Sequence, residues 1–327
     1  MLRLAAVGVR HGHNWSLVDG LVKTRQAELA AVVEDHPELV AKARERYDVP
    51  VYGTVEALLK AEEVHVASLA PTNNRKADAI CALARRGVHC LVDKPLATTL
   101  DDLARIEAAV RESGVHCVMA LPVRFFPAHW AAKRLIDDGA IGDIAAVFAM
   151  RTHNLHPETR RSWELNTEEN GGPLVDLGSH DYDFAAWCVG SRPVSVFGNA
   201  SLKRYTDLSG FADAAQMMVR FADGAAAWVC SDWLTPDDAR GSATGVQIVG
   251  TRGVLRVSER DGDLALLTGG TGWQQAPTDA DRPDMVRDFL AGLRGEPHIV
   301  TADQCLNTAR VLLHGRASAG TGAAVAL

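Results

Sequence analysis

The sequence predicts an α/β protein of two domains: an N-terminal doubly wound parallel sheet, and a C-terminal α+β domain with a large, mostly antiparallel sheet. Two observations predict this class. Short apolar strands alternate with amphipathic helices in the first part of the chain, and longer strand-like stretches joined by Gly-containing turns follow. The chain has 327 residues, enough for two hydrophobic cores. We expect the domains to comprise residues 1–121 and 122–327.

Six short apolar segments are the expected strands of the first domain. They are residues 2–7, 28–33, 51–52, 65–70, 88–92 and 115–119. Helix starts are recognisable between them, because Pro37 suits a first helical position and Thr54 and Thr99 can cap the helices that follow. Strands alternating with helices in this way are typical of a parallel sheet covered on both faces.

The second domain is expected to begin with a helix and to continue mainly as strands. We expect helices at residues 127–138, 174–188, 283–293 and 302–317, and strands at residues 144–152, 194–202, 214–221, 225–232, 245–249 and 253–257. Asp223-Gly224 is a hairpin turn of the usual kind. The tail from Ser318 is expected to be loosely ordered, except near Val325-Ala326-Leu327. The helices can cover one face of the sheet, so the other face predicts a homodimer or homotetramer.

Composition and charge exclude several classes of function. The net charge is -7, and the charges of both signs are interspersed, without the basic run that a nucleic-acid partner requires. The apolar stretch before Gly8 is too short for a signal segment or a membrane span. The six cysteines lack CxxC spacing and lie mostly in apolar runs. We therefore expect a cytoplasmic protein with reduced cysteines and no membrane or nucleic-acid partner.

The first strand runs into a turn that keeps part of a dinucleotide-binding fingerprint, Gly8-Val9-Arg10-His11-Gly12-His13. Gly8 allows the sharp turn, and Arg10 replaces the glycine that normally lets the backbone approach a pyrophosphate. The free N–H groups of the following helix, together with Arg10, can hold phosphate. A glycine turn without a ligand is the alternative, but its place between the first strand and a helix favours a Rossmann-type nucleotide site.

The second strand ends in two carboxylates, Glu34 and Asp35. A carboxylate here can accept the ribose hydroxyls of NAD, although the pair could also only solvate the strand end or cap the helix at Pro37. The extra phosphate of NADP would face two like charges. We therefore expect NAD to be preferred over NADP by about tenfold or more.

Three later segments carry a resemblance to a known family. Asp93-Lys94-Pro95 follows the fifth strand, where a lysine points into the ligand crevice of a parallel sheet. The others are Arg124-Phe125-Phe126-Pro127 and Gly171-Gly172-Pro173-Leu174-Val175-Asp176-Leu177-Gly178-Ser179-His180-Asp181-Tyr182-Asp183. In this order they resemble the Glu-Lys-Pro, Arg-Phe-Asn-Pro and Gly-Gly-x-Leu-x-Asp-x-Gly-x-His-x-x-Asp motifs of the Gfo/Idh/MocA oxidoreductases. The resemblance covers nearly the whole chain.

The resemblance implies an NAD-dependent oxidoreductase that transfers hydride between the nicotinamide and a secondary alcohol or ketone of a sugar, cyclitol or related polyol. It implies that Lys94 and His180 contact the reacting hydroxyl and that Asp176 positions the substrate. A histidine such as His180 suits proton transfer near neutral pH, and Lys94 can polarise the oxygen or share the proton, so the proton acceptor is left open between them. The implied cofactor-binding residues are Gly8, Arg10, His11, Gly12, His13, Glu34, Asp35, Ala70, Pro71, Asn73, Asp93, Lys94 and Arg124. The candidate substrate-binding residues are Lys94, His153, His156, Trp163, Asp176 and His180.

The chain also departs from the family pattern. Asp93 is one methylene shorter than the usual glutamate, and Arg75 stands where a histidine often follows the fourth strand. His153 and His156 could bind a metal, contact substrate or lie on the surface; nicotinamide chemistry needs no metal, and none is expected. Two other functions stay open: NAD-assisted elimination or hydrolysis of a glycoside without net redox change, and a non-catalytic NAD-binding regulator, which Lys94, Asp176 and His180 argue against.

Overall fold

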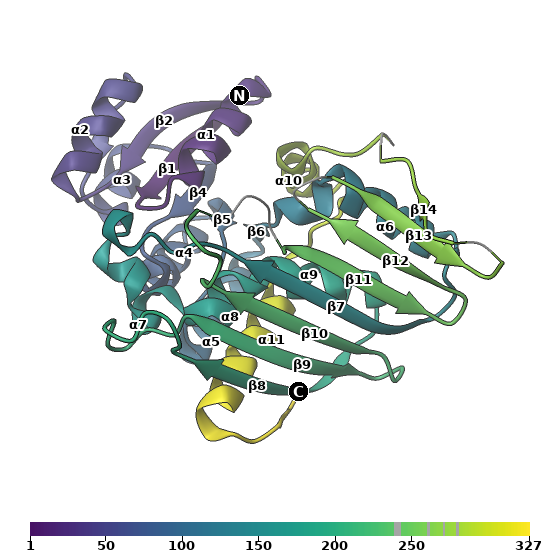
Figure 1. Ribbon diagram of the computed structural model, residues 1–327. Coiled ribbons are helices and arrows are strands. Elements are labelled where there is room, and N and C mark those ends of the chain that lie inside the picture. The colour runs from purple at the N-terminus through teal and green to yellow at the C-terminus, as the bar shows by residue number, and fades with distance from the viewer. Residues whose placement is uncertain (239–242, 260–261, 271, 279–280) are drawn as a thin grey trace. The chain divides into compact units, whose positions relative to one another are not determined.

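The computed structural model describes residues 1–238, 243–259, 262–270, 272–278 and 281–327, which form two compact units (Figure 1). The first unit contains Met1–Ala120 and Asp284–Leu306, and the second Leu121–Pro283 and Asn307–Leu327. The division expected after residue 121 put Asp284–Leu306 with the second domain. These residues instead pack on the first unit, where Phe289 of α10 (Met285–Leu293) stacks on His116 with ring centroids 5.5 Å apart.

The first unit is built on a parallel sheet with the strand order β3-β2-β1-β4-β5-β6, as counted over the described residues. This order is that of a doubly wound dinucleotide fold. The strands are β1 (Leu2–Val9), β2 (Ala27–Val33), β3 (Val51–Tyr52), β4 (Val66–Ala70), β5 (His89–Asp93) and β6 (Cys117–Ala120). Each lies at a segment expected from its apolar residues, so the parallel-sheet prediction is confirmed.

The helices of the first unit begin where the sequence signals predict. Pro37 is the first residue of its helix, and the hydroxyls of Thr54 and Thr99 accept the N–H groups of Ala57 and Asp102. These side chains satisfy backbone donors that have no partner within the helix. The elements are α1 (His13–Lys23), α2 (Pro37–Arg46), α3 (Val55–Ala61), the 3-10 turn η1 (Asn73–Arg75), α4 (Lys76–Ala84) and α5 (Leu100–Ser113).

The second unit contains a sheet with the order β14-β13-β12-β11-β7-β10-β9-β8-β15 in the described residues. Only the β7–β10 pair is parallel among these neighbours, which confirms the mostly antiparallel prediction. The strands are β7 (Ile144–Thr152), β8 (Pro193–Ser201), β9 (Ala214–Phe221), β10 (Ala226–Asp232), β11 (Gly245–Gly250), β12 (Gly253–Ser258), β13 (Leu264–Thr268), β14 (Gln274–Gln275) and β15 (Val325–Ala326). The strands β13, β14 and β15 were not predicted. β14 and β15 have only two residues each, and β13 is recognised as a strand by its pairing with β12.

Two helices differ from the prediction. The segment expected as one helix over residues 174–188 is divided into α8 (Gly172–Asp176) and α9 (Gly178–Val189). Gly178 packs so closely on β10 that a Cβ there would lie 3.0 Å from the Ser231 hydroxyl. The tail from Ser318 is not loose, because α11 (Ala302–Thr321) continues through it and the buried Ser318 hydroxyl accepts the N–H of Gly198. The remaining helical elements are η2 (Pro122–Phe125), α6 (Pro127–Asp137), η3 (Pro157–Thr159), η4 (Ser162–Leu165) and α7 (Thr167–Asn170).

The large sheet has one covered and one open face. Helices α8, α9 and α11 lie behind it in Figure 1, and α8 and α9 contact β7, β9 and β10. On the other face the register aligns Phe148, Trp228, Met218 and Phe197 in one row across β7, β10, β9 and β8. Phe148 and Phe197 are 44% and 42% exposed, and Phe148 stacks on Trp228. In the part of the chain that the structure describes, no helix is both long and apolar enough to cross a bilayer.

Candidate active site

The turn after β1 requires a glycine at position 8. Gly8 has φ +71°, and a Cβ there would lie 2.4 Å from the Pro71 nitrogen and 2.9 Å from the Ala70 carbonyl carbon. The N–H of Arg10 donates to the Ala70 oxygen at 3.1 Å. The turns after β1 and β4 therefore touch through their backbones, and residues 8, 70 and 71 lie together as the sequence predicts.

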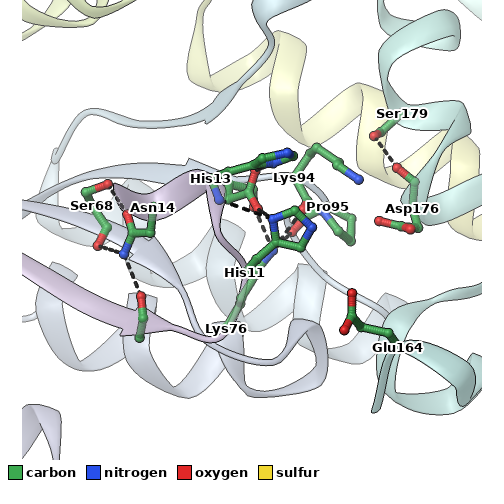
Figure 2. A network of polar contacts seen from close by, with 12 residues as sticks. His11, His13, Asn14, Ser68, Lys76, Lys94, Pro95, Glu164, Asp176 and Ser179 are labelled. Carbon is green, nitrogen blue, oxygen red and sulfur yellow. Dashed lines mark hydrogen bonds and ion pairs between the residues drawn. The ribbon is translucent and has the colours of Figure 1, made fainter. Parts of the chain in front are cut away.

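Two buried side chains hold this turn in place through hydrogen bonds. The Asn14 amide donates to the carbonyls of Gly8 and Ser68, and the Ser68 hydroxyl donates to the Asn14 side-chain oxygen (Figure 2). Sequence reasoning missed both residues. The signal available in the sequence was the position of Asn14 directly after His13, the last residue of the glycine turn. In the structure Asn14 is fully buried.

Glu34 holds the turn and has little capacity left for a ligand. Its side chain is 1% exposed and lies 2.9 Å from the Arg10 Nε. Its oxygens accept the N–H groups of Val9 (2.9 Å), Asp35 (3.0 Å) and His36 (2.9 Å). Three of these donors lie on Oε1 and one on Oε2, so Glu34 fits poorly the expected role of holding both ribose hydroxyls.

Asp35 is the more accessible of the two carboxylates. Its side chain is 45% exposed, one oxygen contacts the Arg10 guanidinium, and the other lies 3.1 Å from the Arg75 guanidinium. Burial alone would raise the pKa of Asp35, but hydrogen bonds from Arg75 and Arg10 outweigh it and lower the pKa below its usual value. Asp35 is therefore an ionised acceptor flanked by two cations.

A cavity of about 250 Å³ opens beside this group within the first unit. Its lining comes from the turns after β1, β2, β3 and β4 and includes Gly8, Arg10, Asp35, Pro71 and Arg75. The carboxyl ends of parallel strands are where open α/β sheets bind ligands. A dinucleotide fits these residues, because the space beside Gly12 at the start of α1 is open to a phosphate and Asp35 can accept a ribose hydroxyl.

Two histidines of the first turn face the carboxylate that ends β5. The His13 Nδ1 lies 3.1 Å from one oxygen of Asp93 and the His11 Nδ1 lies 3.4 Å from the other. Burial raises the pKa of Asp93, but the hydrogen bond with His13 and the nearby charge of Lys76 outweigh it, and the pKa lies well below its usual value. The structure thus brings together three residues predicted separately to border the cofactor.

The turn that carries Lys94 is held by a buried lysine that sequence reasoning missed. The Lys94–Pro95 bond is cis, and both residues are buried. The Lys76 ammonium, fully buried at the start of α4, donates to the backbone oxygens of Asp93 (2.6 Å), Lys94 (3.1 Å) and Pro95 (2.9 Å) (Figure 2). The signal available in the sequence was a lysine, Lys76, as the first residue of a helix that is otherwise mostly apolar. Asn73, also expected near the cofactor, is buried in η1.

Asp176 and His180 lie on either side of the break between α8 and α9 in the second unit. Asp176 ends α8 and His180 lies in the first turn of α9, and both are half-buried while the residues between them are buried. The Ser179 hydroxyl donates to the Asp176 carbonyl at 3.0 Å, which ties the two helices together. The tight packing of Gly178 fixes the backbone that presents these two side chains.

Arg124 has an internal partner. Its side chain is 2% exposed and forms two 2.7 Å hydrogen bonds with Asp183, whose Oδ1 also accepts the Thr308 hydroxyl. A buried ion pair with this geometry satisfies both groups. We therefore do not keep Arg124 among the cofactor ligands. Arg151, Asp181 and Glu259 form a second buried network in the same unit.

The other expected substrate residues lie on the loops after β7. His153 is exposed beside the Trp233 ring, and His156 is half-buried, with its Nδ1 3.5 Å from Glu158 and 3.8 Å from Asp237. Trp163 is buried in η4. These three residues lie in the same unit as Asp176 and His180.

Comparison with known proteins identifies the two halves of the chain. Residues 3–121 match the family described as an oxidoreductase family with an NAD-binding Rossmann fold, and residues 129–256 match the GFO/IDH/MocA C-terminal domain. The scyllo-inositol 2-dehydrogenase (NAD(+)) of Bacillus subtilis is 29% identical over 180 residues, which cover 54% of this chain and 50% of that enzyme. The D-xylose 1-dehydrogenase (NADP(+)) 2 of Haloferax volcanii is 25% identical over 338 residues, covering 100% of this chain and 98% of that enzyme.

The fold is also found among solved structures. The aldose-aldose oxidoreductase from Caulobacter crescentus, complexed with glycerol, matches with a TM-score of 0.84 at 22% identity, covering 100% of this chain and 99% of that chain. The chain spans about half the length of several curated relatives that it matches. The relatives include enzymes named for NAD and for NADP. Because the matched regions cover both halves of the chain, it belongs to the GFO/IDH/MocA family of oxidoreductases.

Proposed function

We propose that the protein is an NAD-dependent dehydrogenase that transfers hydride between the nicotinamide and a secondary alcohol or ketone of a sugar, cyclitol or related polyol. The observation that carries this proposal is the buried turn at the end of β5, where Lys76 fixes the backbone that presents Lys94. The same unit contains the cavity lined by Gly8 and Asp35. The names of the relatives, which act on inositol and xylose, support the substrate class.

The proposed chemistry gives each of the three residues that the resemblance implies a separate role. NAD, held by the residues of the first unit, would supply the hydride acceptor, and the hydroxyl proton must leave for a base of this chain. Lys94 donates a hydrogen bond to the reacting oxygen, and His180 either takes the proton or shares it with Lys94. Asp176 accepts a hydrogen bond from a second substrate hydroxyl and fixes the orientation of the ring. His153, His156 and Trp163 are proposed to border the rest of the substrate.

We also propose that NAD is preferred over NADP and that the protein forms a homodimer or homotetramer. Asp35 supports the first proposal because it is an ionised acceptor on the cavity wall. The row of Phe148, Trp228, Met218 and Phe197 supports the second, because aromatic side chains on a sheet face are typical of an interface between copies.

A screen of sugars, inositols and their acids with NAD and NADP tests the activity. Appearance of reduced nicotinamide in step with a ketone product is expected. Lys94→Ala and His180→Ala should each lower kcat by about 100-fold or more on the substrate found, while the dissociation constant for NAD changes little. Asp176→Asn should mainly raise KM. Near-parental turnover in both alanine variants would remove Lys94 and His180 from the mechanism.

A further inference from the structure

Two histidines and a carboxylate of the first unit lie close together and offer the kinds of donor atoms that bind metal ions. One ring nitrogen of His11, one ring nitrogen of His13 and one carboxylate oxygen of Asp93 lie within 4.8 Å of one another. The closest pairs, His13 Nδ1 to Asp93 Oδ1 and His11 Nδ1 to Asp93 Oδ2, are 3.1 and 3.4 Å apart. Figure 2 shows both imidazole rings beside the Lys94-Pro95 turn.

The two shortest separations, each to a different oxygen of Asp93, are close to those between neighbouring ligands of a small tetrahedral ion. Zinc binds histidine nitrogen and carboxylate oxygen at about 2.0–2.2 Å, so neighbouring ligands of a tetrahedral site are about 3.3–3.5 Å apart. Two imidazoles and one carboxylate also make up the protein ligands of zinc sites that keep a fourth position for water. Imidazole favours zinc and other transition metals, whereas magnesium and calcium prefer oxygen ligands.

The carboxylate is buried, and the two imidazoles lie between it and solvent. The Asp93 side chain is 4% exposed, while those of His11 and His13 are 26% and 56% exposed. A buried carboxylate needs a cation or strong donors beside it. The nearby Lys76 ammonium uses its three protons on the backbone oxygens of Asp93, Lys94 and Pro95. The carboxylate itself therefore faces the two imidazoles, on a side that solvent can reach through His13.

We propose that His11, His13 and Asp93 bind a single divalent transition-metal ion, with zinc as the best match and one coordination position open to water. The ion adds positive charge at the start of α1, where the helix already favours anions. His11 and His13 come from the first turn and Asp93 from the end of β5, so the ion joins two elements that border the cavity side of the sheet. The proposal does not depend on dehydrogenase activity and can be tested without a substrate.

The test uses the full-length chain after removal of metals with a chelator. Calorimetric titration with Zn²⁺ alone is expected to show one ion per chain. His11→Ala and His13→Ala should each weaken this binding by about 100-fold or more, since loss of a ligand exceeds the 10–100-fold effect of losing an outer-shell partner. Because the His13 side chain is more than half exposed at the start of α1, its removal should leave the fold intact, and circular dichroism checks this.

His156→Ala is the matched control. The His156 Nδ1 also lies near two carboxylates, Glu158 at 3.5 Å and Asp237 at 3.8 Å, but in the second unit. This variant should keep the parental affinity for Zn²⁺. Titration with Co²⁺ should give the visible spectrum of a tetrahedral site with nitrogen and oxygen ligands. Failure to bind either ion, equal binding by the parental chain and both alanine variants, or a thiolate charge-transfer band would each overturn the proposal.

Discussion

Replacing Asp35 with serine should convert the protein from NAD to NADP preference. In the parental chain Asp35 pairs with the guanidinium groups of Arg10 and Arg75, so the two cations are engaged by a carboxylate at the cavity wall. A phosphate on the adenosine ribose would meet that carboxylate. In Asp35→Ser the same two cations face the phosphate instead, and the serine hydroxyl can still hydrogen-bond to it.

The expected size follows from two contributions. Two unit charges 4 Å apart repel by about 1 kcal/mol in water and about 4 kcal/mol at the effective dielectric of a protein surface, and Asp35→Ser removes this repulsion. A hydrogen bond to a charged group adds about 1.5–3 kcal/mol; since the Arg75 side chain is 61% exposed, the low end applies to it. A combined change of about 3 kcal/mol corresponds to roughly a 100-fold change in the ratio of the NADP and NAD dissociation constants.

Calorimetric titration of both dinucleotides measures this ratio without a substrate. Asp35→Asn is the isosteric comparison, which removes the charge and keeps the size of the side chain. The double variant Asp35→Ser/Arg75→Ala should bind NADP at least about tenfold more weakly than Asp35→Ser does, since one of the two cations is lost. If Asp35→Ser leaves the affinity for NADP unchanged, the adenosine ribose does not bind beside Asp35 and the reasoning is wrong.

Three further outcomes are expected. Lys76→Met should lower the free energy of unfolding by about 3 kcal/mol, because three backbone oxygens lose a charged donor, and on a substrate found by the screen it should lower kcat more than it raises KM, through Lys94. Burial lowers the pKa of His129 from 6.5 to about 4, so its contribution to stability is complete above pH 6.5 and is lost as the pH falls towards 4. Urea unfolding should show a loss of up to about 3 kcal/mol over this range, and a shallower loss in His129→Leu. Replacing Phe148 and Trp228 with lysine should reduce the mass measured by light scattering to that of a monomer; an unchanged mass would place the interface elsewhere.

Most elements were predictable from local signals. The strand at residues 144–152 has the same bounds in the structure, since it is an isolated apolar run of ordinary length. The caps at Thr54 and Thr99 could be read from the sequence because an N-cap depends on its own side chain and the next few N–H groups. The division between α8 and α9 could not, because it lies beside the close contact of Gly178 with β10, a strand about fifty residues later, which only the fold shows.

The candidate site divides in the same way. Asp93, Lys94, Asp176 and His180 stand out because their types and order form motifs that a sequence displays directly. The role of Glu34 as an acceptor that holds the turn could not be predicted from its position, since it depends on N–H groups of two separate strand ends.

The sequence by itself determined the parallel sheet, the antiparallel sheet and the residues proposed to carry the chemistry, because periodicity, caps and motifs are local properties of the chain. The tertiary structure decided which polar groups are already satisfied and which remain available to a ligand. Lys76 donates to the backbone of the Lys94 turn, Arg124 pairs with Asp183, and His11 and His13 contact Asp93. Each contact joins residues at least seventeen positions apart in the sequence. Such pairings depend on which strand ends the sheet brings together, and no local pattern contains that information.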